Sequence, residues 1–544
     1  MKLVTVAEMQ VVEREANANG LTYELMMENA GKGLAEVVDE VYAAEKNGGA
    51  FGLVGSGNNG GDTLVALAIL AERGWKATAY IVRSRPMDDR LMKRLSSSGG
   101  NIFTLESDSA YSELLRQLGN HAVILDGILG TGIRLPLRGE IAEALNHTHQ
   151  AILTLSPRPK VVAVDCPSGV DCDSGEADST CLVADLTVTM AAVKTGLLRF
   201  PAVNLVGELR VVGIGLEGVR APLPTWEGIK RRVAEPEKVK ATLPKRSKDS
   251  HKGSFGTALV VAGSINYTGA AILAGKAAYR IGAGLVTLAV PEPLYSALAG
   301  HFPEATWVIL PDEMGVISGE AAQVLLENLE RPTAMLIGPG IGLEDVTREF
   351  LNRLFRTAVS GKRASIGFVS AAPRESQTEV VKLPGLVIDA DGLKLLARLQ
   401  DWVTRIPAHT VLTPHPGEMA ILSGLSVNQI QTDRIGIAEK YAQAWGHVLV
   451  LKGANTVVAS PDGRTTVIPV ASPALARAGT GDVLAGTILG LRAQGMAAYE
   501  AAVAGAWIHA QCGLQVSKTL GTTASVLAGD LLGAIPVVLS QLGY

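Results

Sequence analysis

A short unit recurs along this sequence and constrains its fold more than any other feature. Each copy has a run of apolar residues, then a glycine-rich turn, then an amphipathic helical pattern. Residues 51–54 lead into the turn 55–62 and a helical pattern that starts at Leu64. Residues 122–126 and 161–165 end in glycine turns in the same way. Apolar strands that alternate with helices are typical of parallel sheets covered on both faces, so we predict an α/β fold.

The C-terminal half repeats this unit. We expect strands over residues 257–262, 334–337, 386–389, 411–413 and 447–451. Because a glycine-bearing loop follows most of them, we predict a doubly wound parallel sheet whose loops share one rim. At the other end of the chain, residues 5–44 are predicted to form two helices with a break at residues 29–31, since Leu34, Val38 and Val41 recur at helical spacing.

The chain is long enough for more than one domain. Its 544 residues exceed the roughly 100–200 residues typical of one domain. Between residues 216 and 250 the pattern loosens, with four prolines and a charged run at 245–249. We place a linker there, with the boundary near residue 225. The predicted domains are residues 1–220, a Rossmann-like three-layer domain, and residues 226–544, a second α/β/α domain.

Composition limits the classes of partner. The 49 Lys and Arg residues against 53 Asp and Glu give a net charge of −4. With no basic stripe, we expect small-molecule ligands and no nucleic acid. The four cysteines lack the paired spacing of a zinc site, so we interpret them as buried apolar residues. No apolar run reaches the roughly 18 residues of a membrane span and no signal-peptide core is present, so we expect a cytoplasmic protein with no membrane partner.

The first glycine turn has the features of a ligand site. Glycine amides at a helix start can hold a pyrophosphate, and the side-chain carbonyls of tandem Asn residues can ligate a hard cation. The alternative is a tight turn with a polar cap. The candidate ligand-binding residues are Asn58, Asn59, Gly60, Gly61 and Asp62.

Two further strands end in a carboxylate. Asp126 precedes a glycine turn at residues 127–132, and Asp165 precedes Cys-Pro-Ser168-Gly. The carboxyl ends of parallel strands line the ligand crevice in open α/β sheets. We therefore expect Asn59, Asp126 and Ser168 to converge with Asp165, although any one Asp alone could cap a loop.

In the C-terminal half, the chemistry is predicted at residues 476–486. Gly479 and Gly481 leave backbone amides free to hold a phosphate where an apolar helix begins. A carboxylate beside that phosphate suits a general base for a substrate hydroxyl, so Asp482 is the candidate. An acid in the first turn of a helix is also common without catalysis. The strand end at Lys452-Gly-Ala-Asn-Thr456 suits a nucleotide phosphate or ribose, whereas His415 alone is more often structural.

The N-terminal motifs, Gly-Ser-Gly-Asn-Asn-Gly-Gly-Asp, Asp126 to Gly132 and Val-Asp-Cys-Pro-Ser-Gly, resemble the NAD(P)H-hydrate epimerase domain over about residues 1–215. The resemblance implies an acid/base at Asp165 and a potassium ion at Asn59, Asp126 and Ser168. Two departures are Thr63, where Gly is usual, and Val193, where Pro is typical, so Lys194 receives no role. Further substrate contacts implied are Asn58 to Asp62 and the loop Gly130, Thr131, Gly132, Ile133, Arg134, Leu135 and Pro136.

The C-terminal motifs, Lys-Gly-Ser-Phe-Gly, Gly-Pro-Gly-Ile-Gly, Thr-Pro-His-Pro-Gly-Glu and Gly-Thr-Gly-Asp, look like a ribokinase-like NAD(P)H-hydrate dehydratase domain over about residues 230–544. The resemblance implies that Gly342, His415 and Asp482 face the hydrate. It also implies that the ligands are NADHX or NADPHX together with ADP or ATP and magnesium. The resemblance further implies a homo-oligomer. Residues 472–478 depart from the usual pattern, so Arg477 could contact phosphate or only carry surface charge. The implied nucleotide-binding residues are Lys452, Gly453, Ala454, Asn455, Thr456, Gly479, Thr480 and Gly481.

Two other functions remain open from the sequence. A vitamin-pathway hydroxyl kinase would share the C-terminal loops but release a stable phosphate ester. The N-terminal half could also be a non-catalytic binding module. Intact Asn59, Asp126 and Asp165 argue against that second alternative.

Overall fold

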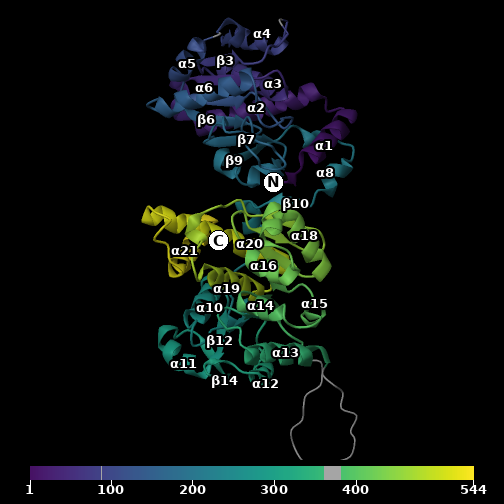
Figure 1. Cartoon of the computed structure of the whole chain (residues 1–544), viewed down its shortest axis with the longest axis vertical. Helices are drawn as coiled ribbons and strands as arrows, with labels where there is room; N and C mark the ends of the chain where they lie inside the picture. The colour runs from purple at the N-terminus through teal and green to yellow at the C-terminus, as the bar shows by residue number, and fades with distance from the viewer. Residues whose placement is uncertain (87, 109, 361–381) are drawn as a thin grey trace, which may run out of the picture. The chain divides into compact units, whose positions relative to one another are not determined.

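The computed structural model describes residues 1–86, 88–108, 110–360 and 382–544. The chain forms two compact units, Met1–Arg231 and Arg232–Tyr544 (Figure 1). The division lies a few residues beyond the position expected near residue 225, because part of the expected linker folds onto the first unit. Helix α8 (Pro224–Gly228) packs on α1 (Val6–Ala18), and both Leu223 and Ile229 are buried in the first unit's core.

Unit 1 is a three-layer α/β domain. Side chains alternate across strand β2: Val54 joins the core that includes helices α2 and α3, whereas Phe51 and Leu53 join the core that includes α5 and α6. The predicted Rossmann-like arrangement is confirmed. The helices are α2 (Tyr23–Val41), α3 (Asn58–Glu72), α5 (Ser112–Gly119) and α6 (Glu140–Thr154). The sheet is parallel, with the order β4 (Asn101–Thr104), β3 (Ala77–Ile81), β2 (Ala50–Val54), β5 (Val123–Gly127), β6 (Lys160–Val164), β7 (Leu186–Met190) and β9 (Glu208–Val212).

The two predicted N-terminal helices are present, but the predicted break at residues 29–31 is wrong. Helix α2 continues through that segment, and the break lies at residues 19–22. Gly31 serves close packing instead, since a Cβ there would lie 2.5 Å from the Cβ of Val65 on α3. Helix α3 also begins earlier than expected, so Asn58 to Asp62 form its first turns rather than a loop.

Unit 2 is built on a second, larger sheet. Seven neighbouring strands of this sheet, β19, β18, β17, β16, β11, β12 and β13, run parallel. Strands β20 and β21 are antiparallel, which the prediction of a parallel sheet did not include. The connections at residues 452–456 and 460–464 are too short for a parallel crossover. The strand order is β10 (Arg231–Val233), β21 (Thr465–Val467), β20 (Val457–Ala459), β19 (Val448–Leu451), β18 (Val411–Leu412), β17 (Gly385–Ile388), β16 (Ala334–Ile337), β11 (Thr257–Val261), β12 (Leu285–Pro291) and β13 (Thr306–Leu310).

Three helices pack on one face of this sheet and a fourth, α21, packs on those helices, so that together they surround a continuous apolar core. They are α10 (Gly269–Arg280), α19 (Thr480–Ala493), α20 (Ala498–Leu520) and α21 (Ala528–Gln541). The α/β class predicted for both halves is confirmed. All four cysteines are free and buried, as expected. Within the described parts of the chain, no helix has both the length and the apolar character needed to cross a membrane.

Candidate active sites

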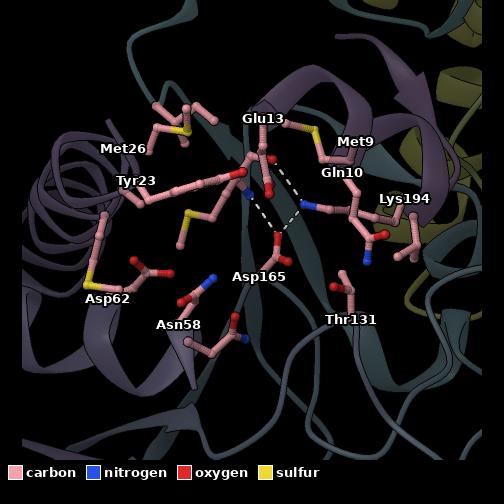
Figure 2. Close-up of a pocket in the computed structure, with 16 residues that line it drawn as sticks. Met9, Gln10, Glu13, Tyr23, Met26, Asn58, Asp62, Thr131, Asp165 and Lys194 are labelled. Atoms are coloured by element: carbon pink, nitrogen blue, oxygen red, sulfur yellow. Dashed lines mark hydrogen bonds and ion pairs between the residues drawn. The ribbon is translucent and has the colours of Figure 1, made fainter. Parts of the chain in front are cut away.

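Unit 1 has a cavity at the carboxyl ends of its strands (Figure 2). Its volume is about 120 Å³. Sites that enclose a drug-sized ligand measure roughly 300–1,000 Å³, so this cavity can bury only part of a dinucleotide. The lining includes Asn58, Asn59, Asp62, Thr131 and Asp165 from the predicted site, together with Glu13, Gln10 and Lys194, which the sequence analysis did not assign.

Asp165 lies in the cavity wall, held by a buried ion pair with Lys194. Its Oδ1 accepts hydrogen bonds from Thr189 Oγ1 and from the amide of Met190, both at 2.9 Å. Its backbone has a φ of +63°, which is uncommon for a residue with a Cβ and clusters at functional sites. Burial disfavours the charge of Lys194, but the Asp165 carboxylate outweighs burial and raises the pKa of Lys194.

Lys194 is a site residue that sequence reasoning left without a role. Only 2% of its side chain is exposed, and Nζ also donates to Thr189 Oγ1 at 3.1 Å and to the Met190 carbonyl at 3.0 Å. A lysine inside an apolar stretch is itself a signal, because buried lysines almost always have a partner. That signal was available at residues 186–194.

Two more carboxyl groups line the same cavity. Burial is the main cause that raises the pKa of Glu13, and the Asp165 carboxylate adds to it while Lys194 opposes it. Burial and then Asp165 raise the pKa of Asp62 well above its ordinary value. The site therefore combines one ion pair with two carboxyl groups that favour the protonated form.

The three predicted cation ligands converge beneath the cavity. Ser168 donates its amide to Asp126 Oδ2 at 2.8 Å, and its Oγ accepts from the Leu129 amide at 2.9 Å. Asn59 Nδ2 donates to the carbonyls of Leu129 at 3.0 Å and Val164 at 2.6 Å. The expected convergence of these strand ends is present.

One oxygen in this cluster has no partner. Asp126 Oδ1 is buried and accepts no hydrogen bond from the described residues. Burial raises the pKa of this carboxyl. An orphaned buried carboxylate oxygen calls for an ion or a water molecule, so Asn59, Asp126 and Ser168 fit a cation held by oxygen ligands. No group of three or more His, Cys, Asp or Glu side chains able to hold a metal occurs within the described ranges, so such a cation would rely on neutral oxygens as well.

The remaining predicted substrate contacts in unit 1 lie around the cavity mouth. Thr131 lines the cavity, whereas Gly132, Arg134 and Pro136 are exposed on the loop that follows β5. Gly60 and Gly61 are buried inside α3. A Cβ on Gly60 would lie 2.0 Å from the Gly55 carbonyl oxygen, so only glycine fits there.

Unit 2 has a larger cavity, of about 420 Å³, beside the start of α19. Its volume falls within the range of small-molecule sites, roughly 300–1,000 Å³. Seven predicted residues line it: His415, Lys452, Gly453, Ala454, Thr456, Thr480 and Gly481. Gly342, Asn455, Gly479 and Asp482 are not part of this lining.

Lys452 lines the cavity, and its ammonium group contacts two buried carboxylates. Its Nζ lies 2.6 Å from Asp389 Oδ1 and 3.6 Å from Glu418 Oε2. Burial disfavours its charge, but Asp389 and then Glu418 outweigh burial and raise the pKa of Lys452. The ammonium group is thus committed to protein carboxylates, and Asp389 is a second site residue that sequence reasoning passed over.

Asp482 stands in the first turn of α19, directly after Gly481, as the sequence predicted. Burial, with the nearby Asp389 carboxylate, raises the pKa of Asp482 to about 7, while Lys452 opposes the shift. A carboxyl group that titrates near neutral pH is suited to accept a proton during turnover.

His415 has a structural task in this conformation. Its Nδ1 accepts from the amides of Gly417 and Glu418 at 3.0 and 3.3 Å, which caps helix α16 (Pro416–Ser423). Its side chain is about half exposed and faces the cavity, so capping leaves the ring accessible. Gly342 has a φ of +87° and donates its amide to Asp391 at 3.2 Å.

Arg477 lines the cavity wall, and its guanidinium donates to the carbonyl of Ala524. Thr480 Oγ1 donates to the carbonyls of Leu475 and Arg477 at 2.9 and 2.8 Å. Hydrogen bonds of its own side chains therefore hold the loop that precedes α19 beside the cavity.

Two α/β units, each with an acidic group beside a cavity at the strand ends or at a helix start, define a two-site enzyme that acts on small molecules. A family model described as NAD(P)H-hydrate dehydratase matches residues 258–537, and one described as YjeF-related protein N-terminus matches residues 23–196. The bifunctional NAD(P)H-hydrate repair enzyme of Moorella thermoacetica is 36% identical over 100% of this chain and 97% of its own length. The chain belongs to the family of bifunctional NAD(P)H-hydrate repair enzymes.

A second curated relative agrees with that assignment. The repair enzyme of Salinibacter ruber is 34% identical over 99% of this chain and 96% of its own length. Among solved structures, the ADP/ATP-dependent NAD(P)H-hydrate dehydratase of Bacillus subtilis, co-crystallised with ATP/Mg2+, is 29% identical. It covers 57% of this chain and 98% of its own, with a TM-score of 0.47.

Proposed function

We propose that this chain repairs hydrated nicotinamide nucleotides. Unit 1 interconverts the R and S hydrates of NADH and NADPH, and unit 2 converts the S hydrate back to the reduced nucleotide with ADP or ATP. The observation that carries the proposal is the match of the repair enzymes to the full length of this chain. It is supported by a carboxyl group in each unit, Asp165 in the lining of one cavity and Asp482 in the first turn of α19.

In unit 2, the amides at the start of α19 cradle the phosphate to be transferred. Asp482 accepts the proton of the hydrate's hydroxyl as that oxygen attacks the terminal phosphorus. The phosphate then leaves with the C–O electron pair, and loss of a proton from the adjacent carbon restores the double bond. Lys452 to Thr456 hold the rest of the nucleotide, and His415 and Gly342 contact the hydrate.

Magnesium in unit 2 neutralises charge on the transferred phosphates when it is bound. Asp389 and Glu418 are both engaged by Lys452. When bound, magnesium would be held mainly through the phosphates of the nucleotide, as is common for this ion.

In unit 1, Asp165 exchanges protons with the hydrated ring, and Lys194 keeps its carboxylate oriented. Asn59, Asp126 and Ser168 would hold potassium, which would neutralise the buried Asp126 carboxylate and stabilise the loops that carry Asp165 and Thr131. Asn58 to Asp62 and residues 130–136 contact the remainder of the dinucleotide.

The test is recovery of reduced-nicotinamide absorbance from an equal mixture of R and S hydrates with ADP, ATP or no nucleotide. The wild-type chain should recover both epimers with at least one nucleotide. Asp165→Asn should recover only the S portion quickly, and Asp482→Asn should recover neither. A stable phosphate ester in place of the reduced nucleotide would instead support a hydroxyl kinase.

A further inference from the structure

Helix α1 supplies part of the unit 1 cavity, although it precedes the region matched by the family model. The match begins at residue 23, whereas α1 spans Val6–Ala18. Val6, Met9, Gln10 and Glu13 recur at helical spacing and all line the cavity. One side of α1 is therefore a wall of the site, and Glu13 is its carboxylate.

The position of α1 is fixed by contacts at its N-terminal end. Thr5 and Glu8 form a capping box, with Glu8 Oε2 accepting from the Thr5 amide at 2.8 Å. Strand β1 (Leu3–Val4), which leads into the helix, pairs with β8 (Val193–Lys194), so that Val4 lies in register with Lys194. The same short sheet thus carries Lys194 and places Glu13 over the site.

Figure 2 shows the Glu13 carboxylate directed toward Asp165 and the Lys194 ammonium group. Lys194 is paired with Asp165, and within the described residues neither Glu13 nor Asp62 has an ion-pair partner. Burial, and after it the Asp165 carboxylate, raise the pKa of Glu13, while Lys194 opposes the shift. The charged and titratable groups around Glu13 are Lys194, Asp165, Asp62, Tyr23 and, on its own helix, Arg14.

We propose that Glu13 is a second catalytic residue of the epimerase site and protonates the hydroxyl that leaves the hydrated ring. This inference rests on the proposed function of unit 1. It assigns to α1 a chemical task in addition to closing the cavity.

The proton and electron balance of this step is simple. Water added to an enamine double bond leaves a hydroxyl on the carbon next to nitrogen. When Glu13 donates its proton to that hydroxyl, the C–O bond breaks, water departs with the bonding pair, and the ring nitrogen lone pair forms a C=N bond. Water then adds to either face of the planar carbon, and its proton returns to Glu13 or Asp165. The Asp165 and Glu13 carboxylates stabilise the transient cation.

The experiment compares Glu13→Gln with Glu15→Gln in the full chain. Both replace a carboxylate by an amide on α1, but Glu15 bonds Thr225 and does not line the cavity. Pure R hydrate is incubated without nucleotide, and conversion to S is followed in oxygen-18 water. Nucleotide-dependent dehydration of pure S hydrate by the same samples reports that the chain is folded.

We expect Glu13→Gln to lower epimerisation by roughly 10²–10⁴-fold, as for loss of a general acid, with dehydration unchanged. The wild-type rate should fall as pH rises through the raised pKa of Glu13, and the variant should lack this fall. Glu13→Asp should keep part of the epimerisation rate, and Glu15→Gln should keep nearly all of it. Oxygen from the solvent should enter the product at the same rate as epimerisation.

Epimerisation by Glu13→Gln within twofold of wild type, or epimerisation without solvent oxygen, would overturn the inference. If Asp165→Asn is inactive while Glu13→Gln is not, the proposed function stands and only the role of Glu13 falls. A wild-type chain that dehydrates S hydrate but never converts R to S would remove both.

Discussion

At the scale of single residues, Asp482 gives the clearest pH dependence. A base must be ionised to accept a proton, so dehydration should rise with pH up to about 7, where this carboxyl titrates. Asp482→Asn should lose roughly 10²–10⁴-fold of the dehydration rate, with epimerisation unchanged. The measurement is the initial rate of NADH recovery from S hydrate across pH. Near-wild-type turnover by the variant would show that Asp482 is only an acidic residue at a helix start and not the catalytic base.

The same residue should affect stability in the opposite direction. Its folded pKa of about 7 lies above the ordinary 3.8, so the folded chain binds this proton more tightly than the unfolded chain. Stability from this group is therefore fully present at low pH and is lost as pH rises through about 7. Asp482→Asn should raise the thermal midpoint of unit 2 relative to wild type above neutral pH and change it little in acid. Equal midpoint differences at both pH values would contradict this.

The orphaned oxygen of Asp126 leads to a prediction about cations. Potassium should raise the thermal midpoint of unit 1, since a ligand that binds only the folded state stabilises it. Tetramethylammonium, which is too large for the cluster, should not. Asp126→Asn should abolish the difference between the two salts. Identical midpoints for the wild-type chain in both salts would argue against a cation at Asn59, Asp126 and Ser168.

Which residues the sequence could reveal depends on the range of their contacts. Asp126, Asp165 and Ser168 were predicted because parallel strands bring their carboxyl ends to one edge. Glu13 was not, since it reaches the site through a pairing of β1 with β8 that no local pattern encodes. Lys194 was not assigned either, although its place in an apolar stretch was a usable signal. Asp482 was predicted from the glycines that precede it, but its raised pKa depends on burial and then on Asp389, which follows strand β17.

At the scale of elements, the crossing of α10 and α19 depends on a glycine. A Cβ at Gly486 would lie 2.1 Å from the Ala274 carbonyl oxygen, so the two backbones are in near contact. Gly486→Ala should destabilise unit 2 by about 1–3 kcal/mol, the usual cost of overpacking. Denaturant unfolding measures this cost.

The matched control is Gly533→Ala in α21, where an added Cβ meets no atom within 4 Å. Better helix propensity should stabilise this variant by about 0.5–1 kcal/mol. Destabilisation of both variants by equal amounts would mean that close packing is not the cause.

The elements themselves were largely predictable, and the errors share one cause. Gly31 was interpreted as a helix break, but it lies inside α2. The residue is glycine because Val65 leaves no room for a side chain at that position. The first turns of α3 were expected to be a loop because of Gly60 and Gly61. In the structure these two glycines lie within the helix and permit close packing there. Glycine in a sequence marks either a turn or a close contact, and only the tertiary structure distinguishes them.

At the scale of the whole molecule, the division after Arg231 determines where the chain can be cut. A fragment of residues 1–231 should be more stable than one of residues 1–220, because the shorter one lacks Leu223 and Ile229, which are buried in the first core, and Thr225, which bonds Glu15 at 2.6 Å. Thermal midpoints of the two fragments test this. Equal midpoints would show that the segment after residue 220 adds nothing to unit 1. The homo-oligomer stays a prediction that sedimentation can test.

The pairing of β1 with β8 also has a consequence for the order of events during synthesis. Residues 3 and 4 leave the ribosome early but find their partners only when Val193 and Lys194 have emerged. Until then α1 has no fixed position over the strand ends, and the Asp165 carboxylate lacks its ammonium partner. Since exposed apolar surface on incomplete chains attracts chaperones and aggregation, this interval is the vulnerable stage in the production of unit 1.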